Sequence, residues 1–494
     1  MSWVSSGLGH IRLTHDMQPS WALCSKCQGR GRIRQNIRKK AKLSYQAALL
    51  QFEQHGGAAP EPPKAHLSIC PRCLGSGLKA ADYPPVADTE HYPHVAIIGG
   101  GIGGVALAVA CLHRGIPFTL YERDRDFSAR SQGYGLTLQQ ACKAIEGLGI
   151  VSLDQGVVST RHVMHSTDGT VLGEWGVRNW QHTDATKTPK RTNVHIARQS
   201  LRLALLEQLA AHPRLHEALK WGHQLLDLKE TPAGVELSFV VDGQTKTANA
   251  DLVVGADGIR SAVRHLVLAD DASSLRYLDC IAILGICPLS ALSDVDSDLL
   301  DSATVFQTAN GHERIYVMPF AADSVMWQLS FPMLESAAKA LSAAGAEALK
   351  AEACKRAPWH SPIPQILAAT PVDLVSGYPV YDRALLSADV LAGMGSITLL
   401  GDAAHPMSPF KGQGANQALL DALSLARMIV RGCHPQTNWR EAGLPSRVLS
   451  EYEAEMLERS AIKVQDSAAA AEFLHTEEIL HASDQPRGRC LKEY

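Results

Sequence analysis

Residues 94–104 read HVAIIGGGIGG, an apolar run followed by Gly99, Gly101 and Gly104 in the spacing G-x-G-x-x-G. This spacing is typical of the turn between the first strand and the helix of a nucleotide-binding βαβ unit. The first glycine permits the tight turn, the second lets the backbone approach a pyrophosphate, and the third lets helix and strand pack closely. A small-residue helix and a second strand, FTLYERD, follow in the sequence. We therefore expect a Rossmann-like α/β unit here.

Glu122 lies at the end of this second strand, 21 residues after Gly101. A carboxylate at this place can accept hydrogen bonds from an adenosine ribose. We assign Glu122 and the next residue, Arg123, to the cofactor site. NAD, NADP and FAD all lay a pyrophosphate on such a turn, so this unit alone does not separate them.

A later segment, residues 397–422, reads ITLLGDAAHPMSPFKGQGANQALLDA. Its strand ends in a short carboxylate, Asp402, which can bond the hydroxyls of a flavin's ribityl chain but would repel a phosphate. Gly412 and Gly414 allow backbone N–H groups at the start of the next helix to point inward. A helix N-terminus aimed at a flavin favours the negative charge of the reduced flavin. This segment therefore favours FAD.

Together with DLVVGADGIRSAVR at residues 251–264, these segments make the chain from about residue 95 to 430 resemble the FAD-dependent aromatic-hydroxylase family, the single-component flavoprotein monooxygenases. The three motifs occur in the family's order. The resemblance implies FAD as cofactor. It also assigns further cofactor-binding residues, namely Arg198 on the flavin side, Asp257 and Gly258 near the pyrophosphate, and Asn416.

The resemblance implies a monooxygenase that uses NAD(P)H and oxygen to hydroxylate an aromatic or polyketide-like substrate through a flavin C4a-hydroperoxide. Such a reaction needs no side-chain nucleophile, so we predict none. Lys411, where the family often has a small residue, and Arg130 are hypothetical holders of an anionic substrate or reduced flavin. His405 is either a contributor or a structural loop residue. No second G-x-G-x-x-G is visible, so NAD(P)H is expected to bind transiently near the flavin.

The substrate pocket is expected between the motifs, where alternating strand residues are half core and half cavity. The side chains there suit a flat apolar substrate; the candidates are Trp175, Trp180, Tyr316, Met318, Trp327 and Gln328. A flavin-dependent reductase or halogenase is the alternative enzyme. The halogenase signature W-x-W-x-I-P is missing, with only a partial echo in MWQLSFP.

Two cysteine segments near the N-terminus, CSKCQGRG at 24–31 and CPRCLGSG at 70–77, repeat the pattern C-x-x-C-x-G-x-G. Each resembles a zinc knuckle of the cysteine-rich region of DnaJ-like chaperones. Four thiolates complete a closed tetrahedral site, which is structural rather than catalytic. We predict zinc on Cys24, Cys27, Cys70 and Cys73. The alternative is two pairs of free or redox-active thiols.

The charge distribution sets this N-terminal part apart. The whole chain has a net charge of −3, which does not favour a nucleic-acid or membrane-surface binder. Residues 1–94, however, hold twelve Lys or Arg against six Asp or Glu. The basic stretch at 32–54 is expected to be helical. It is either a solvated face or a docking surface for an acidic protein or nucleic acid. A further alternative for the whole chain is a flavoprotein whose zinc module docks a partner protein that carries the substrate. No secretory leader is visible, so we expect a cytoplasmic protein.

These segments predict an α/β fold, in which a Rossmann-like FAD-binding domain is interleaved with a β-sheet substrate domain. A small zinc-binding module precedes them and helices follow. The expected boundaries are 1–90 for the zinc module and linker, 91–155, 191–274 and 386–435 for the FAD-binding domain, 156–190 and 275–385 for the substrate domain, and 436–494 for the C-terminal helices.

Overall fold

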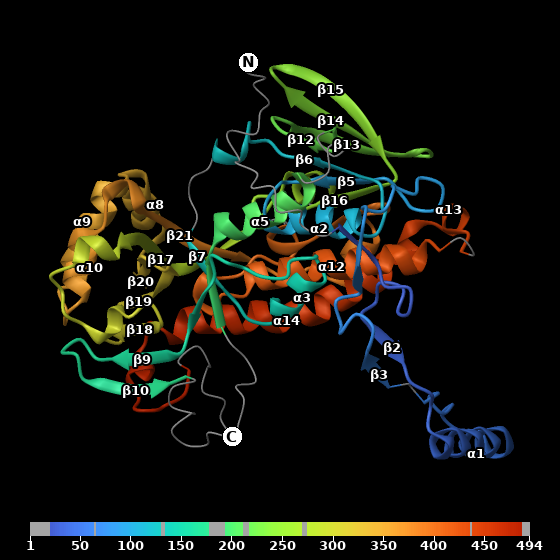
Figure 1. The fold of residues 1–494 in the computed structure, drawn as a ribbon, viewed down its shortest axis with the longest axis horizontal. Helices are drawn as coiled ribbons and strands as arrows, with labels where there is room; N and C mark the ends of the chain where they lie inside the picture. The colour runs from blue at the N-terminus through green and yellow to red at the C-terminus, as the bar shows by residue number, and fades with distance from the viewer. Residues whose placement is uncertain are drawn as a thin grey trace.

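The computed structural model describes residues 20–63, 66–129, 134–176, 193–210, 217–268, 274–434 and 437–486. Figure 1 shows two large sheets side by side, with a long C-terminal helix beneath them and a small N-terminal module at one end. The expected α/β architecture with a parallel sheet and an antiparallel sheet is confirmed.

The five-stranded sheet is parallel and has the order β12-β6-β5-β16-β22. Its strands are β12 (Leu219–Lys220), β6 (Phe118–Tyr121), β5 (Val95–Ile98), β16 (Leu252–Gly255) and β22 (Ile397–Leu399). In the pairing register, Ile98 is level with Gly255, and Gly255 is level with Leu399. The turns that follow these three residues therefore meet at one edge of the sheet.

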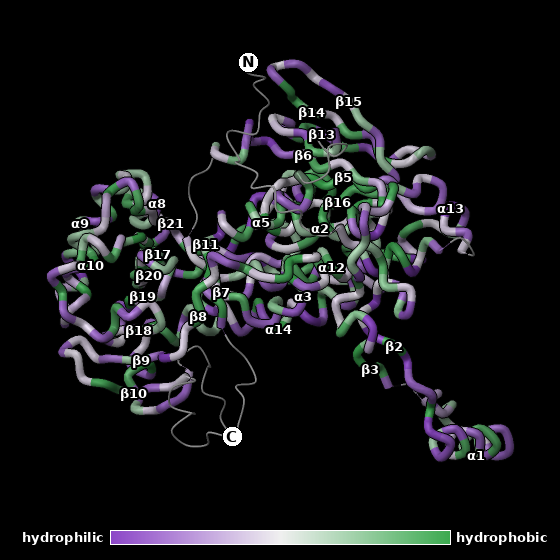
Figure 2. The backbone as a smooth tube through the Cα atoms, viewed as in Figure 1, coloured by the Kyte–Doolittle hydropathy of each residue, from purple (hydrophilic) through white to green (hydrophobic). Residues whose placement is uncertain are grey.

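Helix α2 (Ile102–Leu112) links β5 to β6, and all of its residues are buried. It reads IGGVALAVACL, and a helix that is apolar on every side must be covered on every side. Helices α5 (Arg198–Ala210) and α12 (Gly414–Gly432) pack against it. Figure 2 shows the hydrophobic residues gathered along β5, β16 and α2. The expected βαβ unit is confirmed.

The seven-stranded sheet is mostly antiparallel and has the order β10-β9-β18-β19-β20-β17-β21. Its strands are β10 (Val171–Trp175), β9 (Arg161–His165), β18 (Thr304–Ala309), β19 (Arg314–Ala321), β20 (Ser324–Pro332), β17 (Leu275–Pro288) and β21 (Val375–Arg383). Helices α8 (Glu335–Ala343), α9 (Ala346–Arg356) and α10 (Ile363–Ala369) cover one face of this sheet. The other face carries a second apolar cluster, which also includes Tyr134 and Phe410 from outside this sheet.

Smaller elements connect and flank these sheets. Strands β7 (Gly135–Leu138), β11 (Asn193–Ala197) and β8 (Val157–Ser159) form one three-stranded sheet, and β13 (Gln224–Thr231), β14 (Gly234–Val241) and β15 (Gln244–Ala250) form another. The shorter helices are α3 (Cys142–Glu146), α6 (Ala262–Val267), α11 (Ala388–Ala392) and α13 (Trp439–Ala442). Helix α14 (Ser450–Phe473) is tied to β22 by the Tyr452 hydroxyl, which donates to the Leu399 carbonyl at 2.9 Å.

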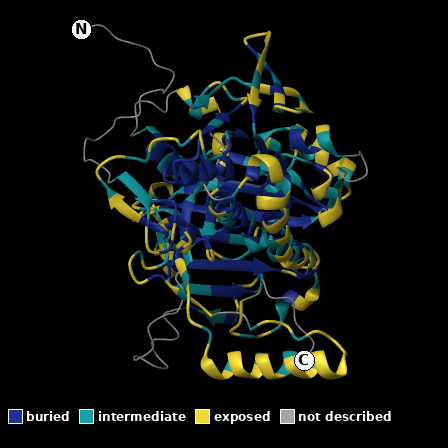
Figure 3. Cartoon of the chain, turned by 90° about the vertical axis from the view of Figure 1, so that its right-hand side faces the viewer, coloured by how far each residue is buried: buried dark blue, intermediate teal, exposed yellow. Residues whose placement is uncertain are grey.

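The N-terminal module contains two strand pairs and one helix. Strand β1 (Ser20–Leu23) pairs with β4 (Leu78–Ala81), and β2 (Arg32–Arg34) pairs with β3 (Leu67–Ile69). Helix α1 (Lys39–His55) has no buried residue and projects away from the body of the molecule (Figures 1 and 3). The expected helix therefore starts later than the basic stretch does. Residues 32–34 form a strand because β3, distant in sequence, lies beside them.

Among the helices of the described ranges, none combines the length and the apolar character needed to cross a membrane.

Candidate functional site

A cavity of about 430 Å³ lies at the carboxyl edge of the parallel sheet. Residues of β5 and β6, of the turns that follow β16 and β22, and of the N-terminal ends of α2, α5 and α12 surround it. Most of the predicted cofactor residues meet here, namely Gly99, Gly101, Glu122, Arg123, Arg198, Asp257, Gly258, Asp402 and Gly414. Ligands of open α/β sheets bind at this edge.

The glycine turn gives the cavity a bare backbone wall. A Cβ atom added at Gly101 would meet no atom within 4 Å, so it would project into open space. At Gly99, with φ +107°, it would lie 2.6 Å from the Ala256 carbonyl oxygen, and at Gly104 it would lie 1.9 Å from the Gly99 carbonyl oxygen. Gly104 therefore serves close packing behind the cavity. Gly101 leaves the room that a pyrophosphate needs beside the α2 N-terminus.

Glu122 holds this turn in place. Its Oε2 accepts a hydrogen bond from the Gly100 N–H at 2.6 Å, and its Oε1 accepts one from the Asp124 N–H at 2.9 Å. A carboxylate has about four acceptor positions, so Glu122 keeps capacity for ribose hydroxyls.

Two arginines one turn apart on α5 face this region. Arg198 is the first residue of α5, and its guanidinium carbon lies 5.7 Å from the Tyr134 ring centroid. Arg202 is buried, donates from Nε to the Gly100 carbonyl at 2.7 Å, and lines the cavity. Sequence reasoning missed Arg202. Its position four residues after Arg198, on the same helix face, was the available signal.

The opposite end of the cavity combines a carboxylate with a helix start. Asp402 follows β22, and a Cβ at Gly414 would lie 3.3 Å from the Asp402 Oδ1. The absence of a side chain at Gly414 therefore lets the first turn of α12 approach Asp402. The unpaired N–H groups of a helix start favour a negative charge in front of them.

The carboxylate of Asp257 forms its hydrogen bonds with residues that follow it closely in the chain. Its carboxylate accepts hydrogen bonds from the Ser261 hydroxyl at 2.5 Å and from the Ala262 and Val263 N–H groups at 2.7 and 3.2 Å. Burial raises the pKa of Asp257, and these hydrogen bonds act against that rise. Asp257 thus binds the first two N–H groups of α6, whose N-cap is Ser261, and fixes the turn at Gly258, which borders the cavity.

Of the residues predicted to bind the cofactor or to contribute to catalysis, five lie outside the cavity lining, namely Gly104, Gly412, Asn416, His405 and Lys411. Asn416 is fully buried and uses its whole amide. Its Oδ1 accepts from the Gln139 and Ala141 N–H groups, and its Nδ2 donates to the Thr137 and Gly412 carbonyls. The side chain therefore clamps α12 to the segment after β7 and has no donor left for a cofactor. Arg130 falls outside the described residues.

His405 belongs to a buried network behind the Asp402 turn. Its Nε2 lies 2.8 Å from Asp421 Oδ2, which also accepts from the Gly401 N–H at 2.8 Å. Arg459 donates to the other oxygen of Asp421 at 2.8 Å. Burial acts to raise the pKa of Asp421, but His405 and Arg459 outweigh it and hold that pKa below its usual value. The network supports Gly401, so the structural interpretation of His405 fits this geometry.

Only some of the residues expected to line the substrate pocket lie on the face of the seven-stranded sheet that turns toward the cavity. Tyr316 and Met318 of β19 lie opposite Gln328 and Met326 of β20, in a cluster with Tyr134, which lines the cavity. Phe410 of the loop after Asp402 joins the same cluster. These side chains form an apolar wall beside the Asp402 end of the cavity.

The prediction for Trp327 is wrong. Its neighbours in β20 face the cavity side, and the alternation of a strand sends Trp327 to the other face. There it lies in the core beneath α8 to α10 and donates to the Thr370 hydroxyl at 2.9 Å. Trp175 stacks on His162 at the outer strands, 5.7 Å between ring centroids. Trp180 falls outside the described residues.

One charged residue interrupts the apolar wall, and the sequence did not single it out. Arg314 is 4% exposed, and its guanidinium carbon lies 5.0 Å from the Tyr316 ring centroid. Its Nε donates to Gln307 Oε1 at 2.9 Å, but among the described residues its Nη1 and the Nε2 of Gln328 have no hydrogen-bond partner. Buried donors of this kind normally have an acceptor.

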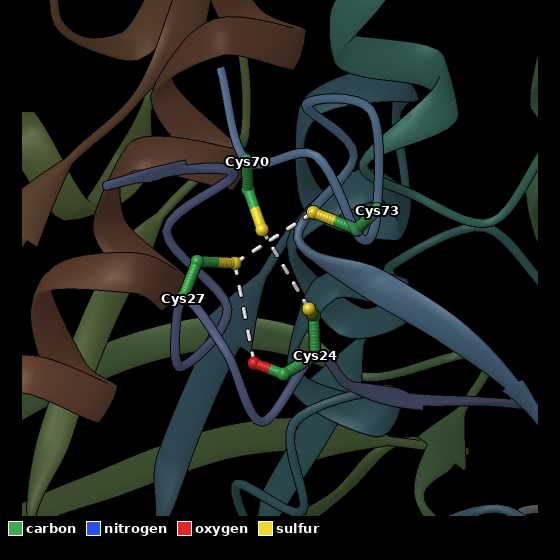
Figure 4. Close-up of side chains that lie close together, drawn as sticks. All are labelled: Cys24, Cys27, Cys70 and Cys73. Carbon is green, nitrogen blue, oxygen red and sulfur yellow. Dashed lines mark hydrogen bonds between the residues drawn. The ribbon is translucent and has the colours of Figure 1, made fainter. Parts of the chain in front are cut away.

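The four cysteines of the N-terminal module converge (Figure 4). Their Sγ atoms all lie within 4.8 Å of one another, with Cys27 and Cys73 at 3.7 Å and Cys24 and Cys70 at 4.0 Å. Sulfurs about 2.3 Å from a tetrahedral zinc lie about 3.8 Å apart. The Gly31 and Gly77 N–H groups each donate to a thiol sulfur at 3.3 Å. The spacing and the donor set fit a four-thiolate metal ion.

Comparison with known proteins decides the family. A family model described as an FAD binding domain matches residues 92–444. The chain belongs to the FAD-dependent monooxygenase family. Aurachin C monooxygenase/isomerase of Stigmatella aurantiaca is 30% identical over 370 residues, which cover 74% of this chain and 85% of the relative. The cysteine module precedes the matched residues.

Two further known proteins are similar to this chain. The 6-hydroxynicotinate 3-monooxygenase of Pseudomonas fluorescens is 27% identical over 403 residues, covering 78% of this chain and 93% of the relative. The crystal structure of Klebsiella pneumoniae HpxO complexed with FAD and uric acid has a TM-score of 0.62 and 21% identity, covering 79% of this chain and 92% of that one. The likeness to HpxO shows that this chain shares the fold of that FAD-binding protein.

Substitution of Gly101 by Ala should weaken FAD binding at least about tenfold, which corresponds to about 1.4 kcal/mol. The added methyl group would occupy the open space in front of the α2 N-terminus without meeting protein atoms. Titration of flavin-free protein with FAD, followed by flavin fluorescence, measures the change.

Gly393→Ala is the matched control, because a Cβ there would meet its nearest atom at 3.5 Å and Gly393 is outside the cavity lining. Equal FAD affinity of the two variants would contradict the assignment of the glycine turn.

Proposed function

We propose that this protein uses FAD, NAD(P)H and molecular oxygen to hydroxylate an electron-rich aromatic or polyketide-like compound. The observation that carries the proposal is the continuity of the cavity. Its glycine end suits a pyrophosphate, its Asp402 end suits a flavin, and the apolar wall around Tyr316 and Met318 begins there. When bound, FAD supplies the redox and oxygen chemistry.

In this proposal the side chains bind, orient and exclude water. Gly99, Gly101 and the α2 N-terminus hold the pyrophosphate, and Glu122 accepts from the ribose. Arg198 and Asp402 flank the flavin, and the α12 N-terminus stabilises negative charge on it. The apolar wall keeps water from the reacting carbon. The domain boundaries expected from the sequence are part of the same proposal.

The substrate is proposed to carry a carboxylate or another anionic acceptor. Arg314 and Gln328 offer buried donors without acceptors on the wall where the substrate would lie. An anionic group there would supply the missing acceptor. The relative from Pseudomonas fluorescens acts, by its name, on 6-hydroxynicotinate, an aromatic acid. NAD(P)H is proposed to bind transiently from solvent.

The direct test is a screen of aromatic compounds for those that accelerate NADH or NADPH oxidation, followed by mass spectrometry of the product under isotopically heavy oxygen. We expect a product that gains one oxygen atom from molecular oxygen. A product that is reduced or halogenated without that oxygen atom would contradict hydroxylation and favour the alternative flavin enzymes.

For any acidic substrate so found, Arg314→Met should raise KM about 10- to 100-fold, because an ionic hydrogen bond contributes about 1.5–3 kcal/mol. Arg314→Lys, which keeps the charge, should recover part of the loss. FAD affinity should stay unchanged in both variants. A KM unaffected by Arg314→Met, or an equal loss for a neutral analogue of the substrate, would remove Arg314 from substrate recognition.

Zinc is proposed as the ion held by Cys24, Cys27, Cys70 and Cys73, because a closed four-thiolate site suits a structural zinc ion. Purified protein should contain one zinc per chain, and Cys70→Ser/Cys73→Ser protein should contain none. Elemental analysis under reducing conditions measures both. Wild-type protein without stoichiometric metal would favour the free-thiol alternative.

A second function is proposed for helix α1, the docking of an acidic protein that supplies or carries the substrate. None of its residues is buried; Leu43 is exposed beside Lys39, Lys40 and Lys42, and Leu50 is exposed two turns further along the helix. The helix therefore contributes surface and little core. A nucleic acid is the less favoured partner, because the body of the chain is acidic.

We expect that helix α1 can be deleted while the rest of the N-terminal module stays folded. Gln35 donates from its N–H to the His66 carbonyl at 2.8 Å, so replacing residues 36–65 by Asn-Gly would close β2 and β3 into a two-residue hairpin. We expect unchanged zinc and FAD content, with loss of any acidic protein that the full chain captures. Loss of zinc or FAD would instead make α1 part of the fold.

A further inference from the structure

The cysteine module is seated on the far ends of the two helices whose starts form the FAD cavity. Ile102 and Gly103 of α2 and Gly414 and Ala415 of α12 line the cavity. At the other end, Leu23 of β1 packs against the large core, and Trp21 lies beside Gly149 and His113, the residue after α2. Each helix therefore spans the distance between the two sites, about 20 Å along α12 from Gly414 to Arg427.

Two arginines near these helix ends lie close to the cysteine module. Arg427 of α12 donates from Nη2 to the Ser76 carbonyl at 3.2 Å, and the same atom lies 3.2 Å from where a Cβ of Gly31 would be. The N–H groups of Gly31 and of Gly77, the residue after Ser76, are the ones that donate to the thiol sulfurs of Cys27 and Cys73. Arg427 thus touches both knuckles next to the sulfur atoms.

Arg114 approaches from the end of α2. It is 2% exposed, donates from Nη1 to the Ala110 carbonyl at 2.9 Å, and lies close enough to Cys27 and Arg427 to interact electrostatically with both. Among the described residues, the Nε and Nη2 atoms of Arg114 and the Nε of Arg427 have no hydrogen-bond partner. Arg114 is buried and Arg427 is partly buried, and two neighbouring cations with buried donors that lack a partner need a nearby negative charge.

A metal–thiolate centre supplies that charge. A divalent ion with four thiolates carries two net negative charges, which balance the two positive charges of the guanidinium groups. The centre would otherwise lie near the C-terminal ends of α2 and α12, where the helix dipole disfavours negative charge. With neutral thiols in place of the centre, the two arginines would face each other without compensation.

We propose that Arg114 and Arg427 are the charge partners of a metal–thiolate centre, and that through them metal binding stabilises the helix pair whose other ends hold FAD. The module is then part of the FAD-binding fold and not an independent appendage. This inference rests on the zinc site proposed above. Its partners act on metal affinity in the way that outer-shell residues of known metal sites do.

The test uses the full chain loaded with zinc and FAD and has two readouts. Competition with a colorimetric chelator measures zinc affinity, and flavin fluorescence during heating measures the temperature of FAD release. Arg114→Met and Arg427→Met should each lower zinc affinity about 10- to 100-fold. Arg431→Met is the matched control. Arg431 lies one turn further along α12, is half exposed and pairs with Glu451, so its loss should leave zinc affinity unchanged.

Chelation of wild-type protein should lower the FAD release temperature. In an Arg114→Met/Arg427→Met protein that temperature should already be low and should respond less to chelation. Arg427→Lys keeps the positive charge and should retain most of the zinc affinity. If the methionine variants fold poorly, this variant still tests whether the charge is what stabilises the metal site.

The inference is overturned if the methionine variants bind zinc as tightly as Arg431→Met protein, if Arg427→Lys loses as much affinity as Arg427→Met, or if chelation leaves the FAD release temperature of the wild type unchanged. Wild-type protein without stoichiometric zinc would refute the metal site itself, and the elemental analysis separates this outcome from the others.

Discussion

The parallel register of β5, β16 and β22 is the constraint on which the site depends. Because Ile98, Gly255 and Leu399 are level in the sheet, the turns after them, which are far apart in the sequence, meet at one edge. One turn presents bare backbone at the start of α2, and another presents Asp402 beside the start of α12. A ligand with a phosphate end and a polyol-linked aromatic end matches this pair of surfaces.

Buried polar groups hold these turns from behind. Asp421 links Gly401, His405 and Arg459, and Asn416 links α12 to the segment after β7. These hydrogen bonds fix the geometry of the turns, because breaking one of them would leave a polar group unpaired in a low-dielectric interior. Residues that look like cofactor ligands in the sequence motif thus serve as supports for the residues that line the cavity.

The sequence predicts what is local in the chain and misses what depends on distant neighbours. The βαβ unit and the helix that starts at Gly414 follow from glycine spacing and apolar periodicity, so they were predicted correctly. Trp327 was placed on the wrong face, because one residue of strand parity decides between cavity and core. Arg202 and Arg314 were missed, because their significance comes from partners on other elements and from their burial. The meeting of four cysteines was predictable from the repeated spacing, whereas the contact of Arg427 with that module was not.

The central claim is that one FAD molecule spans the cavity from the Gly101 turn to Asp402. Equilibrium titration of flavin-stripped protein with FAD, with FMN and NADH as competitors, tests it most directly. The account predicts one tightly bound FAD per chain, displaced by neither competitor, because only FAD joins a pyrophosphate-linked adenosine to a flavin. Binding of FMN or NADH as tight as that of FAD, or no saturable binding of FAD, would contradict it.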